Sequence, residues 1–122
     1  MGWCKRMNLF IWYEKCSTCK RAKEYLDRKG ISYNVRCIKT HNPTYDELKK
    51  WVEEYKVDIK RLFNTSGILY REMGLKDKLL TISDDEKLKL LATNGMLVKR
   101  PLLLTCDNIY IGFKEKEWDE IR

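Results

Sequence analysis

The chain has 122 residues, of which 43% are hydrophobic and 35% are charged, and this composition is typical of one globular domain. It contains no apolar run near the roughly 20 residues of a membrane-spanning helix and no apolar signal-peptide core, so we expect a cytoplasmic protein without membrane contact. The net charge of +7 would attract nucleic acids or anions. Basic and acidic residues alternate along most predicted helices, however, which favours a solvated surface and no direct nucleic-acid binding.

The first part of the chain predicts a β-α-β unit. An apolar run over residues 9–13 is typical of a buried strand, and residues 17–29 have helical periodicity that ends at Gly30. Residues 31–38 alternate as a half-buried strand does. Because a helix connects them, the two strands are expected to be parallel. Residues 1–7 are interpreted as an arm that precedes a domain over residues 8–122.

The middle of the chain predicts only helices. Residues 44–47 and 83–86 both have the form of a capping box, Ser or Thr followed three residues later by Glu. The first capping box opens a helix to about residue 56, and the second opens a helix that ends at Asn94-Gly95. Shorter helical segments are expected between them, at residues 58–63, 69–73 and 76–79.

The last part of the chain predicts a hairpin followed by a helix. Residues 102–106 form an apolar run, Asp107-Asn108 is a turn signal, and residues 109–111 make the return strand. Residues 114–122 are expected to form the last helix. The complete order is β-α-β, several helices, then β-β-α, which predicts an α/β thioredoxin-like fold with a helical insertion between its halves.

The motif with the clearest chemistry is Cys16-Ser17-Thr18-Cys19, which lies between the first strand and the first helix. This placement is typical of a thioredoxin-like redox site. The N–H groups and positive dipole of a helix N-terminus stabilise a thiolate, which is the nucleophilic form of cysteine. We expect Cys16, in the loop, to be the more exposed nucleophile and Cys19 to be either the resolving thiol or a small core side chain.

These features together resemble the ArsC/Spx family over about residues 8–122. The resemblance rests on the Cys16-x-x-Cys19 motif after a strand, the helical insertion, and Arg100-Pro101 before the hydrophobic hairpin. The family includes glutaredoxin-linked arsenate reductases and Spx-type redox regulators that bind RNA polymerase. The segment Phe63-Asn64-Thr65-Ser66-Gly67 resembles a branch often described as arsenate reductase-like.

The resemblance implies a role for four residues. Cys16 matches the family's nucleophile, and Cys19 matches the second thiol of members with two cysteines. Arg100 matches the arginine that precedes a cis-proline, here Pro101. Its guanidinium would stabilise the Cys16 thiolate and bind an oxyanion or a carboxylate, or it would be a structural arginine with an acidic partner. Pro101 would shape the loop that a thiol substrate meets.

Other residues around the motif are candidates for substrate binding. The backbone N–H groups from Ser17 to Cys19 would bind an anion, and Lys20 would add positive potential or simply be solvated. Arsenate reductases have two further arginines, but this chain has Asn64 at one position and no arginine in residues 112–114 at the other. Asn64 would replace one arginine by polar contacts, or it would only form a turn.

A zinc site is an alternative use of the Cys-x-x-Cys motif. The remaining ligands would have to come from Cys37, Cys106 or His41, which lie on other elements without the spacing of a zinc knuckle. We therefore expect no metal and no tightly bound cofactor.

Two functions follow from the resemblance. The first is an arsenate reductase-like thiol–disulfide oxidoreductase that acts on a small oxyanion or a thiol or disulfide substrate. Glutathione with glutaredoxin, or thioredoxin, would be its reductant. The alternative is an Spx-like regulator that binds the RNA polymerase alpha subunit, with a Cys16–Cys19 disulfide as its switch.

Overall fold

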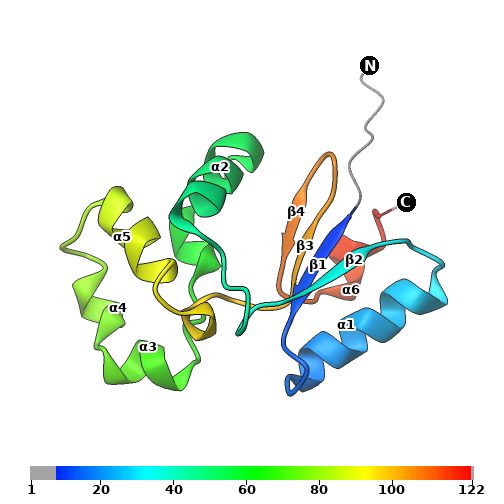
Figure 1. The fold of residues 1–122 in the computed structure, drawn as a ribbon, viewed down its shortest axis with the longest axis horizontal. Helices are drawn as coiled ribbons and strands as arrows, with labels where there is room; N and C mark the ends of the chain where they lie inside the picture. Colours follow the sequence, from blue (N-terminus) through cyan, green and yellow to red (C-terminus); the bar gives the residue numbers. More distant parts are fainter. Residues whose placement is uncertain (1–7, 122) are drawn as a thin grey trace. The chain divides into compact units, whose positions relative to one another are not determined.

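The computed structural model describes residues 8–121, and the arm predicted at residues 1–7 lies outside the described residues. The chain forms two compact units (Figure 1). The first unit comprises the described residues of Met1–Cys37 and Arg100–Arg122, and the second comprises Ile38–Lys99. No described helix has the length and apolar character needed to cross a membrane.

A four-stranded sheet forms the centre of the first unit. Its strands are β1 (Leu9–Trp12), β2 (Asn34–Cys37), β3 (Leu102–Leu104) and β4 (Ile109–Ile111), in the order β2-β1-β3-β4. Strand β1 pairs parallel to β2 and antiparallel to β3, and β3 pairs antiparallel to β4. The fold is thioredoxin-like, with a β-α-β half, a β-β-α half and a helical insertion between them, as the sequence predicted.

Two helices cover the same face of this sheet, α1 (Ser17–Arg28) and α6 (Glu115–Trp118) (Figure 1). In the register of the sheet, Phe10 of β1 lies opposite Leu103 of β3, which lies opposite Tyr110 of β4. These three side chains form one row beneath the helices. The buried cluster contains Phe10, Ala22, Tyr25, Leu26, Leu103, Tyr110, Trp118 and Ile121. The fully buried Trp118 donates an indole hydrogen bond to the carbonyl of Gly112 at 3.1 Å. The core therefore joins segments that lie about 100 positions apart in the chain.

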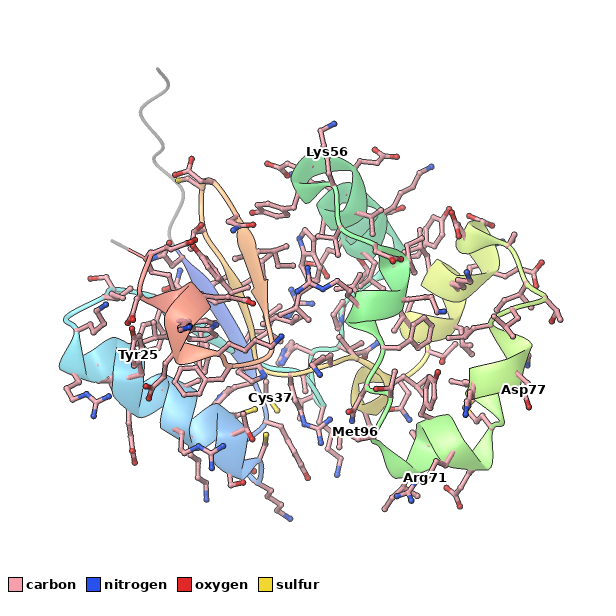
Figure 2. All side chains as sticks on the ribbon, turned by 180° about the vertical axis from the view of Figure 1, so that it is seen from behind. Tyr25, Cys37, Lys56, Arg71, Asp77 and Met96 are labelled. Carbon is pink, nitrogen blue, oxygen red and sulfur yellow. The ribbon has the colours of Figure 1, made fainter. Side chains whose placement is uncertain are left out.

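Three polar side chains interact next to this cluster, at Tyr25, Lys29 and Asp119. Tyr25 lies on α1 where it approaches α6 (Figure 2), and its hydroxyl donates a hydrogen bond to the carboxylate of Asp119. The ammonium of Lys29 donates to the same hydroxyl at 3.2 Å and lies 3.7 Å from the carboxylate. The Asp119 carboxylate raises the pKa of Tyr25, so the hydroxyl keeps its proton and continues to donate.

The second unit contains six short helical elements. They are α2 (Tyr45–Tyr55), the 3-10 helix η1 (Ile59–Leu62), α3 (Ile68–Glu72), α4 (Leu75–Lys78), α5 (Asp84–Leu91) and the 3-10 helix η2 (Gly95–Leu97). The predicted capping box at α2 is present, because Thr44 and Glu47 each accept a backbone hydrogen bond from the other. Ser83 caps α5 by accepting the N–H of Glu86.

The predicted end of the second capped helix was wrong. Helix α5 ends at Leu91, and Asn94 instead begins η2, where its side chain accepts the N–H of Met96 at 2.8 Å. Gly95 does not terminate a helix by a left-handed conformation. A Cβ atom at Gly95 would lie 1.8 Å from the carbonyl oxygen of Ile38, so this position needs glycine for close packing.

The elements of the first unit are shorter than the sequence predicted. Strand β2 begins at Asn34 rather than residue 31, β3 ends at Leu104, and α6 covers only Glu115–Trp118. After Leu104, Thr105 and Asn108 bond to each other and form the hairpin loop. The N–H of Thr105 donates to the Asn108 carbonyl at 2.9 Å, and the N–H of Asn108 donates to the Thr105 hydroxyl at 3.1 Å. Polar pairing within the loop thus ends the strand before its apolar run does.

Candidate functional site

Cys16 is the cap residue at the N-terminus of α1. Its backbone is extended, with φ −98° and ψ 116°, and its sulfur accepts the backbone N–H of Cys19 at 3.3 Å. The N–H of Cys16 donates to the carbonyl of Tyr13 at 3.0 Å, which makes the loop after β1 a tight turn. The half-buried sulfur therefore lies at the positive end of the helix dipole and accepts a backbone hydrogen bond there.

Apart from Cys19, the residues that follow Cys16 in the first turn of α1 carry hydroxyl or basic side chains. The first turn of α1 contains no acidic residue. Ser17 and Lys20 are exposed, and Thr18 is half-buried, with its hydroxyl accepting a hydrogen bond from Arg21 at 3.4 Å. Because the first N–H groups of a helix have no partner within it, those of Ser17 and Thr18 can donate to an anion beside Cys16.

Cys19 differs from Cys16 because it faces the interior of the first unit. It has no exposed surface. The pKa of its thiol is raised from 9.0 to about 12. Burial is the largest cause of this rise, and the hydrogen bond with Cys16 is the second. The Cys19 thiol is therefore protonated at neutral pH. Of the two sulfurs, Cys16 is the accessible one, as the sequence predicted.

Arg100 brings a positive charge near Cys19 from the other end of the chain. It begins the second chain segment of the first unit, and its charge lowers the pKa of Cys19, against the larger effect of burial. The guanidinium carbon lies 5.4 Å from the centre of the Tyr13 ring. Its Nε and Nη1 atoms are buried and have no hydrogen-bond partner among the described residues. A carboxylate or oxyanion is the partner that this edge of a guanidinium fits.

The peptide bond between Arg100 and Pro101 is cis, as the family resemblance implied. Pro101 is buried, and its carbonyl accepts the N–H of Gly112 at 2.8 Å. This hydrogen bond connects the residue before β3 with the residue after β4.

Asn64 belongs to the second unit, in the turn between η1 and α3. Its N–H donates to the carbonyl of Leu97 at 2.7 Å, and its own carbonyl accepts the N–H of Gly67 at 3.0 Å. The side-chain oxygen accepts the hydroxyl of Ser66 at 3.4 Å. The sequence predicted that Asn64 either binds substrate or forms a turn. The contacts in the structure are those of a turn-forming residue.

Tyr13 is a site residue that the sequence analysis missed. It is half-buried, follows β1 directly and contacts both Cys16 and Arg100. The sequence signal that could have identified it is an aromatic residue three positions before Cys16. Its ring contact with Arg100 depends on tertiary folding, because the two residues are 87 positions apart.

The candidate zinc ligands do not gather around the motif. Within residues 8–121, no three His, Cys, Asp or Glu side chains form a group that could hold a metal ion. Cys37 is half-buried at the end of β2 (Figure 2), Cys106 lies in the hairpin turn, and His41 lies in the second unit.

The fold and the paired thiols at the start of α1 define a thioredoxin-like protein with a Cys-x-x-Cys site. Residues 11–121 match the model of the ArsC family, so the chain belongs to this family.

Known proteins similar to this chain divide into two groups. The uncharacterized protein YusI of Bacillus subtilis is 46% identical and covers 91% of this chain and 94% of that protein. A crystal structure described as "a possible arsenate reductase", from Streptococcus mutans, is 44% identical with a TM-score of 0.83, and covers 93% of this chain and 98% of its own. The regulatory protein MgsR of Bacillus subtilis is more distant, at 27% identity over 88% of this chain and 84% of that protein.

Proposed function

We propose that this protein is an arsenate reductase-like thiol–disulfide oxidoreductase in which Cys16 is the nucleophile. The observation that carries the proposal is the position of the Cys16 sulfur. It lies at the N-terminus of α1 and accepts a backbone N–H. Arg100 lies in the same unit, with two buried N–H groups that no described residue accepts. A cysteine at a helix N-terminus, in a unit that also holds unpartnered cationic donors, is suited to attack an anionic centre.

For arsenate, the proposed reaction begins with a bond between the Cys16 sulfur and arsenic. Hydroxide leaves with a proton as water, and Arg100 and the N–H groups of Ser17 and Thr18 stabilise the oxyanion. A second thiolate then attacks the Cys16 sulfur, and the electron pair of the sulfur–arsenic bond passes to arsenic. Arsenic is thereby reduced from the pentavalent to the trivalent state, and two thiols are oxidised to one disulfide.

The second thiol is either Cys19 or glutathione. Cys19 is close, since its N–H contacts the Cys16 sulfur, but its pKa of about 12 keeps it protonated at neutral pH. Glutathione has an exposed thiol with an ordinary pKa, so it is the faster resolving thiol while α1 keeps this conformation. Glutaredoxin or thioredoxin would then reduce the resulting disulfide. The likeness to the Streptococcus mutans protein supports this choice of reaction class.

The test is arsenate-dependent oxidation of NADPH, coupled through glutathione, glutaredoxin and glutathione reductase. We expect turnover in the wild-type protein and none in Cys16→Ser. Cys37→Ser is the matched control, because it makes the same change at another half-buried thiol of the first unit and should keep its turnover.

Two outcomes would contradict the proposal. One is turnover that survives in Cys16→Ser. The other is absence of turnover in a wild-type protein whose thiol count still shows a reversible Cys16–Cys19 disulfide. The second outcome would favour a different disulfide substrate or a redox switch.

A redox-sensing regulator is the second candidate function. It is favoured by the likeness to MgsR and to the global transcriptional regulator Spx 2 of Bacillus anthracis, which is 24% identical over 84% of this chain. The buried second thiol at Cys19 would form the switch disulfide with Cys16. Binding to the C-terminal domain of the RNA polymerase alpha subunit, measured with oxidised and with reduced protein, tests this function, and no binding in either state would exclude it.

A further inference from the structure

Tyr13 connects the thiol loop to Arg100. Its carbonyl accepts the N–H of Cys16 at 3.0 Å, and its ring lies 5.4 Å from the guanidinium carbon of Arg100. Its backbone also forms a hydrogen bond with the Cys19 thiol. All these residues belong to the first unit. Neither the proposed reaction nor the family resemblance gives Tyr13 a role.

The ring of Tyr13 is the contact that the structure gives the Arg100 guanidinium, whose side chain otherwise has many rotamers. No acceptor among the described residues holds its buried Nε or Nη1. A guanidinium stacked on an aromatic face is attracted by the ring and loses less freedom than a lysine would. The guanidinium carbon lies over the Tyr13 ring, and Nε and Nη1 have no partner among the described residues, so these two N–H groups are available for an anion.

We propose that Tyr13 is a positioning residue whose ring holds Arg100 beside the thiols and thereby makes Cys16 selective for anionic partners. This inference rests on the proposed function for its meaning in catalysis. It can be measured on the Cys16 thiol alone, without turnover. If Tyr13 positions Arg100, then removal of the ring should reduce the attraction for anions while the Cys16 sulfur remains reactive.

The experiment compares alkylation of Cys16 by iodoacetate, which is an anion, with alkylation by iodoacetamide, which is neutral. Mass spectrometry of the reduced protein identifies the label on Cys16. The ratio of the two rates reports the positive potential at the sulfur, since a general change in exposure or thiolate population alters both rates together. Arg100→Gln supplies the ratio that remains without the guanidinium charge.

We expect Tyr13→Phe, which keeps the ring, to retain the wild-type ratio. Tyr13→Leu should lower the ratio by about two- to five-fold, the range that the strength of a cation–π contact near the protein surface implies, and bring it close to that of Arg100→Gln. In the Arg100→Gln background, Tyr13→Leu should change the ratio no further, because the charge that the ring positions is absent.

A second variant keeps the test valid if Tyr13→Leu fails to fold. Pentafluorophenylalanine at position 13 keeps the shape of Phe but reverses the charge distribution of the ring, so it should also lower the ratio. Tyr33→Leu is the matched control. Its ring also has a cation above it, Lys23 at 5.8 Å, but it contacts neither thiol nor Arg100, and it should leave the ratio unchanged.

The result that would overturn the inference is a wild-type ratio in folded Tyr13→Leu or in the fluorinated protein. An equal fall of both alkylation rates would overturn it as well. The proposed function can fail independently: a normal ratio pattern together with no arsenate reduction would keep the role of Tyr13 and exclude the substrate.

Discussion

At the scale of single residues, the two cysteines of the motif have different chemistry because they have different surroundings. Cys16 caps the helix and is half-buried, whereas Cys19 is fully buried one turn later. Sequence spacing placed both thiols near one helix end. Only the packing of α1 decides that one thiol is reachable and the other has a pKa of about 12.

Cys19 should therefore give the folded protein a distinct dependence on alkaline pH. Burial raises the folded pKa of the Cys19 thiol from 9.0 to about 12, so its stabilising contribution is complete below pH 9 and is lost as pH rises toward 12. We expect the free energy of unfolding of the wild-type protein to fall over this range more steeply than that of Cys19→Ala. Urea unfolding at a series of pH values checks this, and parallel pH profiles would contradict it.

At the scale of elements, side-chain caps mark the start of α2, η1, α5 and η2. Thr44 and Ser83 act as caps, as their sequence positions predicted, and Asp58 caps η1 by accepting the N–H of Lys60. Asn94-Gly95 has the form of a helix end but begins η2 instead, where the Asn94 side chain accepts the N–H of Met96 and the backbone of Ile38 passes next to Gly95.

Gly95→Ala should be far more destabilising than an ordinary glycine substitution. The new Cβ would lie 1.8 Å from the Ile38 carbonyl oxygen, so the backbone of η2 must shift, and we expect a loss of more than about 3 kcal/mol in the free energy of unfolding.

Gly74→Ala is the matched control for this substitution. Gly74 has a positive φ of 62° but open space around its Cβ position, so its replacement should cost only about 1 kcal/mol. Chemical denaturation compares the two variants, and similar losses would show that the close approach at Gly95 is not the cause.

At the scale of the whole molecule, the first unit is assembled from two chain segments, and the whole second unit lies between them in the sequence. Trp118 is the largest fully buried side chain of the second segment, and its ring contacts Phe10 and Tyr25 from the first. The thiol site depends on this assembly, because Cys16 and Arg100 come from different segments.

Substitutions at Trp118 should consequently affect both stability and the thiol site. We expect Trp118→Ala to lower the free energy of unfolding by about 3–5 kcal/mol, as the loss of a buried aromatic side chain does, and to speed the alkylation of Cys19. Trp118→Phe keeps the ring contacts but leaves the Gly112 carbonyl without its donor, so it should cost about 1–3 kcal/mol. Thermal or urea unfolding with thiol counting checks the series. If Trp118→Ala is destabilised but its Cys19 is alkylated no faster than in the wild type, the expected effect of Trp118 on the thiol site is contradicted.

The sequence by itself determined the order of the elements, the helix caps and the place of the thiol motif. These features depend on local signals: apolar periodicity, capping residues and the spacing of Cys16 and Cys19 along the first helix. It could not determine the role of Gly95 or the contact between Tyr13 and Arg100. Those were decided by tertiary structure, because each depends on atoms of residues distant in the chain that come together only when the units fold.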